Sequence, residues 1–179
     1  ATERTFFDNI GKPTRIKDGY ATLRSTFDAR GNETERRHFD EVGKLTLFTD
    51  GYASWTATYD AHGNQSEAKF FNTAGRSARN RYGVAGWRAT YDAYGNQTRL
   101  AVFDETGNPT RNSEGIAGWQ STFDWRGNET QRTVFDETGK PTSLRDGRAG
   151  WRATFNACGN ETERIFFDKA GRSIPLRSE

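Results

Sequence analysis

Short segments of the chain alternate between apolar and polar residues, which is the pattern of β-strands with one buried face. In residues 87–92, Trp87, Ala89 and Tyr91 share one face, and polar side chains share the other. Residues 97–103 alternate in the same way. No stretch repeats with the period of a helix, and frequent glycines disfavour long helices. The pattern therefore predicts an all-β fold.

The expected strands are separated by turns with the sequence Asp/Asn-x-x-Gly, as at residues 92–95 and 104–107. An Asp or Asn side chain stabilises the start of a type I turn, and Gly then adopts the left-handed conformation. The turns recur at alternating intervals of 12 and 20 residues, and the longer interval holds a further break, as at Asp50-Gly51. We therefore expect about three short antiparallel strands in each repeating unit.

The whole pattern repeats every 32 residues without insertion or deletion. Such a period is the signature of a repeat protein whose units stack on their neighbours. We expect a single array over residues 1–179, with about five and a half units at 1–32, 33–64, 65–96, 97–128, 129–160 and, in part, 161–179. Consecutive hairpins would form an elongated twisted or spiral sheet. A parallel β-helix is less favoured, because it would stack like charges.

The composition is polar for a folded chain, with 32% hydrophobic and 28% charged residues, but 13% are aromatic. The rings hold fixed phases of the repeat, so we expect them to replace the missing aliphatic side chains in the core. A tryptophan row is expected to belong to this core rather than to a ligand platform. Its members are Trp55, Trp87, Trp119 and Trp151.

The sequence does not predict an enzyme, a metal site or a cofactor. The two histidines, His38 and His62, occupy different phases of the repeat, so they do not form a dyad or a zinc site. Cys158 has no visible catalytic partner, and aspartates before turns are expected to cap those turns. No apolar run is long enough to span a membrane. The net charge of +2, with interspersed signs, does not favour a nucleic acid partner.

Candidate binding residues lie at positions that differ between the copies, although the Asp/Asn and Gly residues that define each turn are shared. The variable turn tips are Arg30, His62, Tyr94, Trp125 and Arg126. An exposed Trp125 would be the strongest anchor for a partner. A second variable series within the strands consists of Arg36, Ala68, Leu100, Arg132 and Arg164.

The motifs at Tyr59-Asp60-Ala-His-Gly63-Asn64 and Tyr91-Asp92-Ala-Tyr-Gly95-Asn96 resemble those of the bacterial YD-repeat (Rhs-type) family. In that family such repeats build large β-sheet spirals, often in secreted or surface proteins, and some enclose a toxin. The Gly-Trp pairs, such as Gly86-Trp87, are also similar to tandem bacterial repeats that bind cell-wall material. The resemblance implies a bacterial secreted or cell-surface location.

We therefore expect a non-enzymatic β-repeat scaffold for binding or self-assembly, as part of a larger bacterial surface or secreted protein. A protein partner or self-association into fibres is favoured, since an open sheet edge invites pairing with another chain. One alternative is a carbohydrate or cell-wall binding module that uses the repeat tryptophans. Another is a shell segment of a secreted toxin-type protein.

Overall fold

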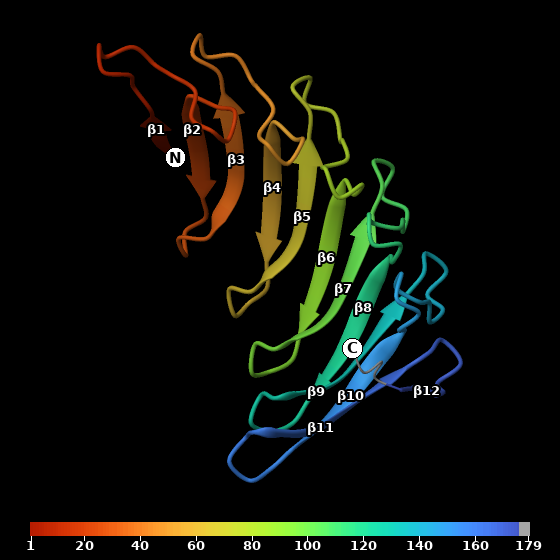
Figure 1. Ribbon diagram of the computed structural model, residues 1–179. Helices are drawn as coiled ribbons and strands as arrows, with labels where there is room; N and C mark the ends of the chain where they lie inside the picture. Colours follow the sequence, from red (N-terminus) through yellow and green to blue (C-terminus); the bar gives the residue numbers. More distant parts are fainter. Residues whose placement is uncertain (176–179) are drawn as a thin grey trace. The chain divides into compact units, whose positions relative to one another are not determined.

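A computed structural model describes residues 1–175, which form twelve β-strands and no helix (Figure 1). Residues 176–179, at the end of the expected partial unit, lie outside the described residues. The strands are β1 (Thr2–Thr5), β2 (Thr22–Phe27), β3 (Glu33–Phe39), β4 (Ser54–Tyr59), β5 (Gln65–Phe71), β6 (Gly86–Tyr91), β7 (Gln97–Phe103), β8 (Gly118–Phe123), β9 (Glu129–Phe135), β10 (Gly150–Phe155), β11 (Glu161–Phe167) and β12 (Ser173–Ile174).

The chain divides into two compact units, and the order of strands within each follows the chain. The first unit consists of residues 1–87 and 104–108, and holds β1 to β5. The second consists of residues 88–103 and the chain from 109 onward, and holds β7 to β12. The all-β fold of tandem antiparallel hairpins is confirmed. The single array over the whole chain stays a prediction.

Each hairpin joins a six-residue strand to a seven-residue strand through an Asp/Asn-x-x-Gly turn, as in β4–β5 and β8–β9. The pairing shifts by one residue beside the turn, between Thr58 and Tyr59 in β4 and between Thr122 and Phe123 in β8. This shift is a β-bulge, which increases the local twist of the hairpin.

The third strand expected in each unit is reduced to a single bridge. Phe39 bridges Leu45, and the equivalent bridge at Phe103 is made to Pro109. Beyond the bridge the chain leaves the sheet and turns again at a glycine, as at Gly51, where the peptide N–H donates to the carbonyl of Phe48. Pro109 has no N–H, so it cannot extend a ladder. The segment is therefore a loop that folds back to the sheet.

The core lies where these loops meet the sheet, and its most buried side chains are small. Ala53 returns the second loop to the sheet, since its N–H donates to the carbonyl of Phe71 and its carbonyl accepts from the N–H of His38. The equivalent alanines are all buried, and they are Ala21, Ala53, Ala85, Ala117 and Ala149. In the first unit, Tyr20 and Tyr52 directly precede two of these alanines, and both of their rings contact Phe48. Buried alanines therefore recur in the core of both units.

The two faces of each hairpin differ. In β4–β5, Trp55 lies opposite Phe70, and Ala57 lies opposite Ala68, all on the face that the loops approach. The other face carries charged and hydroxyl side chains between phenylalanines, for example Lys69 beside Phe71. Arginines lie over these phenylalanine rings in both units, with Arg24 4.4 Å from the ring centre of Phe39.

Candidate binding site at the turn edge

The hairpin turns form one edge of each unit, which we call the turn edge, and it consists of residues 28–32, 60–64, 92–96, 124–128 and 156–160 (Figure 1). The loops lie at the opposite ends of the strands, which we call the loop edge. All of the turn-tip candidates predicted from the sequence belong to the turn edge.

Each turn is held by bonds within itself. In the turn at 60–64, Asp60 Oδ1 accepts hydrogen bonds from the peptide N–H groups of His62 and Asn64, at 2.8 and 2.9 Å. Asp60 Oδ2 accepts from Asn64 Nδ2 at 2.9 Å. Gly63 has φ +88°, a conformation that glycine adopts readily. The same three carboxylate bonds occur at Asp28, Asp92 and Asp124.

These bonds favour the ionised carboxylates. The hydrogen bond from the asparagine side chain is the largest cause that lowers the pKa of Asp28, Asp60, Asp92 and Asp124 below the usual range. The fifth turn carries Asn156 instead, whose Oδ1 still accepts from Cys158 N and Asn160 N, at 2.9 and 3.0 Å. The first residue of each turn therefore serves the turn itself.

We call the hydrogen bonds within each turn, made by its first, third and fifth residues, the turn frame. The tip side chains of the second unit lie outside this frame. Tyr94 is 82% exposed and Trp125 is 78% exposed. Arg126 places its guanidinium 4.5 Å from the ring centre of Trp125. The same guanidinium donates to the carbonyl of Ala157 in the next turn. Arg126 therefore links a neighbouring turn to the exposed indole.

The tips of the first unit are Arg30 and His62, on consecutive turns. Arg30 Nη1 donates to the carbonyl of Ala61 at 2.8 Å, just as Arg126 does in the second unit. A shallow recess beside this contact is lined by Arg30, Tyr59 and Asp60, among others. The Tyr59 hydroxyl donates to the carbonyl of Glu33 at 2.8 Å, which ties this hairpin to the one before it.

The arginines of the second variable series form ion pairs with glutamates of the same strand. Arg36 pairs with Glu33 at 2.5 Å, and Arg132 pairs with Glu129 at 2.7 Å. The third arginine, Arg164, pairs with Glu161 in the same way. The two copies without arginine, at Ala68 and Leu100, carry Gln65 and Gln97 in place of the glutamate. This co-variation accounts for the five residues of the series without a binding partner, whereas Arg4, at the same phase, has Ala1 in place of the glutamate.

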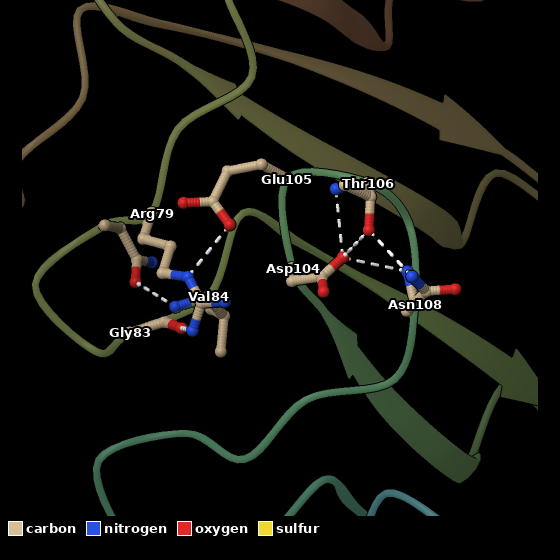
Figure 2. A network of polar contacts seen from close by, with 8 residues as sticks. Arg79, Gly83, Val84, Asp104, Glu105, Thr106 and Asn108 are labelled. Carbon is tan, nitrogen blue, oxygen red and sulfur yellow. Dashed lines mark hydrogen bonds and ion pairs between the residues drawn. The ribbon is translucent and has the colours of Figure 1, made fainter.

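Arginine and glutamate also form ion pairs at the loop edge, and there too both residues are replaced together. Arg79 donates to Glu105 Oε2 at 2.9 Å and to the carbonyl of Gly83 at 3.1 Å (Figure 2). Asp104 beside it holds its own turn by accepting from Thr106 and Asn108. Equivalent ion pairs join Arg15 to Glu41 and Arg111 to Glu137. Where the arginine is replaced, by Leu47 and Ser143, the glutamate is also replaced, by Thr73 and Lys169.

The tryptophan row is half-buried rather than fully buried. Arginines of the second variable series cover three of its rings. Arg36 lies 5.5 Å from the ring centre of Trp55, and Arg132 lies 4.2 Å from that of Trp119. Arg164 lies 4.0 Å from that of Trp151. These rings therefore already have partners within the fold.

Within residues 1–175, no three His, Cys, Asp or Glu side chains are grouped so that they could hold a metal ion. Cys158 is exposed at its turn tip. No helix that could cross a membrane is present in this part of the chain.

No protein-family model and no curated protein matches the sequence. Among solved structures, the chain is similar to one of TcdB2-TccC3-Cdc42, with 16% identity and a TM-score of 0.31 over 83% of this chain and 9% of that one. It is also similar to the Photorhabdus luminescens Tc holotoxin pore with a TccC3 mutation, with 18% identity and a TM-score of 0.34, over 89% and 10% of the two chains. A third structure, TcdB2-TccC3 without its hypervariable C-terminal region, gives 17% and 0.34, over 86% and 9%. The chain spans about a tenth of the length of these proteins.

Proposed function

We propose that the chain is a non-enzymatic β-repeat scaffold that binds a protein partner through the turn edge of its second unit. The observation that carries the proposal is the exposure of Tyr94 and Trp125 on turns that are fixed by their own hydrogen bonds. Tyrosine, tryptophan and arginine are the residues that dominate binding hot spots.

The turn frame separates folding from recognition. The side chains that make the frame belong to the first and fifth residues of each turn, while the third residue contributes only its peptide N–H, so the side chains of the two tip residues stay outside. The copies accordingly differ at the tips while they share the frame. Antibody loops use the same combination of rigid aromatic anchors with glycine and asparagine. This arrangement supports a surface that can change its contacts without changing the fold.

The available contact energy suits a specific partner. A tryptophan side chain buries roughly 150–250 Å², and burial contributes about 25 cal/mol per Å². With 78% of Trp125 exposed, its burial against a partner would contribute about 3–5 kcal/mol before the costs of association. Arg126 reduces those costs, because it stacks on the indole and is itself bound to the next turn.

The chemistry of the frame argues against a hydrolytic function. Both oxygens of Asp92 and Asp124 already accept hydrogen bonds from their own turns, and their pKa values are lowered, so they are poor general acids. We place the chain in a larger bacterial secreted or surface protein because of the YD-repeat resemblance at Tyr59-Asp60 and Tyr91-Asp92. A role as a shell segment remains an expectation from that resemblance.

A capture experiment tests the proposal. The immobilised chain is exposed to the soluble proteins and the polysaccharides of the organism that produces it, and each captured species is purified and titrated by calorimetry. We expect a protein whose affinity falls at least about tenfold for the Tyr94→Ala/Trp125→Ala variant. The control is the Ile10→Ala/Val42→Ala variant, which removes two side chains of 70% and 77% exposure from the loop edge of the first unit.

Two results would contradict the proposal. A captured protein that binds the wild type and the Tyr94→Ala/Trp125→Ala variant equally would place the contact elsewhere. A captured polysaccharide whose binding is lost on substitution of the tryptophan row would favour the carbohydrate-binding alternative.

A further inference from the structure

We propose that His38 makes the first two loops of the first unit sensitive to acid. This inference goes beyond partner binding, and it concerns residues 12–20 and 44–52, which approach the sheet on either side of this side chain. His38 lies in β3 on the face that carries the core, and it is 2% exposed.

The position of His38 is apolar in every other copy of the repeat. The equivalent residues are Phe6, Phe70, Val102, Val134 and Phe166. A histidine therefore occupies a site built for an apolar side chain. It is the one point in this series where a change of pH can introduce a charge.

The contacts of His38 place it between the loops. Its ring stacks on Phe48 of the second loop, with centres 5.0 Å apart and planes 12° apart. Tyr20, at the end of the first loop, lies 4.9 Å away, and Tyr52, at the end of the second, lies 5.9 Å away. Phe48 and Tyr20 also contact each other. Both loops therefore rest on this one imidazole ring.

The hydrogen bond of the ring fixes the tautomer of its neutral form, and it favours the charged form less than burial opposes it. His38 Nδ1 lies 3.0 Å from the carbonyl oxygen of Ala53, which can only accept, so Nδ1 carries the proton. A second proton would go to Nε2 and would give an imidazolium within the ring cluster. A buried charge is costly unless it is paired.

The charged groups around the cluster do not remove this cost. Arg36 on β3 opposes protonation, while Glu33 on β3 and Asp18 on the first loop favour it. Glu33 is already paired with Arg36, and Asp50 on the second loop is paired with Arg81. Burial is the largest influence, and it lowers the pKa of His38. Burial also raises the pKa of Tyr52 to about 12, so that hydroxyl stays neutral.

The direction of the pH effect follows from linkage. A histidine whose pKa is lowered in the closed state binds a proton more readily when the loops open. Stability of the closed loops therefore rises with pH, and it is lost as the pH falls below about 6.5, the ordinary value for an exposed imidazole. The second unit has Val102, Val134 and Phe166 at this position, so its loops lack this response.

Amide hydrogen exchange on the whole chain tests the proposal, with rates corrected for the intrinsic effect of pH. Between pH 7 and pH 5.5, we expect protection in residues 12–20 and 44–52 to fall by up to about tenfold for the one pH unit below the imidazole pKa. Protection in the loops of the second unit, residues 109–116 and 140–148, should stay within about twofold. The variant His38→Phe, which installs the residue found at Phe70, should abolish the response of the first unit.

A second measurement keeps the proposal testable if His38→Phe does not fold. The imidazole signals are followed by NMR during a pH titration of the wild type, with the His62→Ala variant to assign the two histidines. A His38 pKa at or above the ordinary value would overturn the proposal. An equal loss of protection in both units, or an unchanged response in a folded His38→Phe variant, would also overturn it.

Discussion

Substitution of Gly118 by alanine tests the packing of neighbouring hairpins in the second unit. Gly118 begins β8, where it lies opposite Ala101 of β7. A Cβ added to Gly118 would lie 2.2 Å from the carbonyl oxygen of Leu100 and 3.1 Å from the Cα of Ala101. Both are backbone atoms, so the strands themselves must separate by about 1 Å to restore an ordinary contact.

Overpacking of this kind costs roughly 1–3 kcal/mol. Alanine lowers the entropy of the unfolded chain and recovers about 0.4–1 kcal/mol. We therefore expect Gly118→Ala to lower the free energy of unfolding by about 1–2 kcal/mol. Urea unfolding followed by tryptophan fluorescence measures it, with Trp119 as a neighbouring reporter. Hydrogen exchange in β7 and β8 measures the same effect locally, because repeat proteins do not always unfold in one step.

The chain supplies a matched control. One of the equivalent positions in the first unit holds Ser54, so the backbone there already accommodates a Cβ. Ser54→Ala should change the free energy of unfolding by less than about 1 kcal/mol. If Gly118→Ala is no less stable than Ser54→Ala, the close approach of β7 and β8 is refuted as a constraint on this position.

Three further predictions concern substitutions of one or two side chains. Trp125→Ala should leave the free energy of unfolding within about 0.5 kcal/mol of the wild type in a urea titration, because its ring lies outside the turn frame; a larger loss would assign Trp125 to the fold. The effects of Arg111→Ala and Glu137→Ala on the free energy of unfolding should be non-additive in a double-mutant cycle at low salt. Their coupling should vanish in 1 M salt because the pair is exposed. Additive effects at low salt would mean that the pair contributes nothing. The lowered pKa of Asp124 means that its contribution to stability is present above about pH 4 and is lost in acid. Asp124→Asn, which copies the turn at Asn156, should therefore lose stability at pH 7 but show a smaller loss than the wild type on acidification, and equal acid sensitivity would contradict this.

The turn frame could be predicted from the sequence because its interactions are local. An Asp or Asn, a glycine and an asparagine within five residues are enough to define the turn, and Asp60, Gly63 and Asn64 make the expected contacts. The alternation of residues likewise predicted the strands. Both signals depend only on near neighbours in the chain, and a strict repeat multiplies each of them.

The covering of the sheet by its loops could not be predicted in this way. It depends on contacts such as that between Tyr20 and His38, which join different repeats. The rings were expected to form the core, whereas Ala21 and Ala53 are more deeply buried than any ring. A signal for the buried histidine was nevertheless present, since its equivalents Phe70 and Val102 are apolar.

The ion pairs between repeats left a readable trace as well. Arg79 and Glu105 are 26 residues apart, so no local pattern links them. Their co-variation does, because the copies that lose the arginine, at Leu47 and Ser143, also lose the glutamate. Variation between copies therefore has two meanings in this chain. At these positions a change in one residue is matched by a change in its ion-pair partner, and at the exposed tips the residues change without such a match.

Hydroxyl-radical footprinting of the chain with its captured protein partner tests the central claim most directly, because it reports which rings become covered. The turn-edge account predicts that oxidation of Tyr94 and Trp125 falls strongly on binding, while that of the half-buried Trp55 and Trp151 changes little. Unchanged oxidation of Tyr94 and Trp125 in the saturated complex would contradict the account.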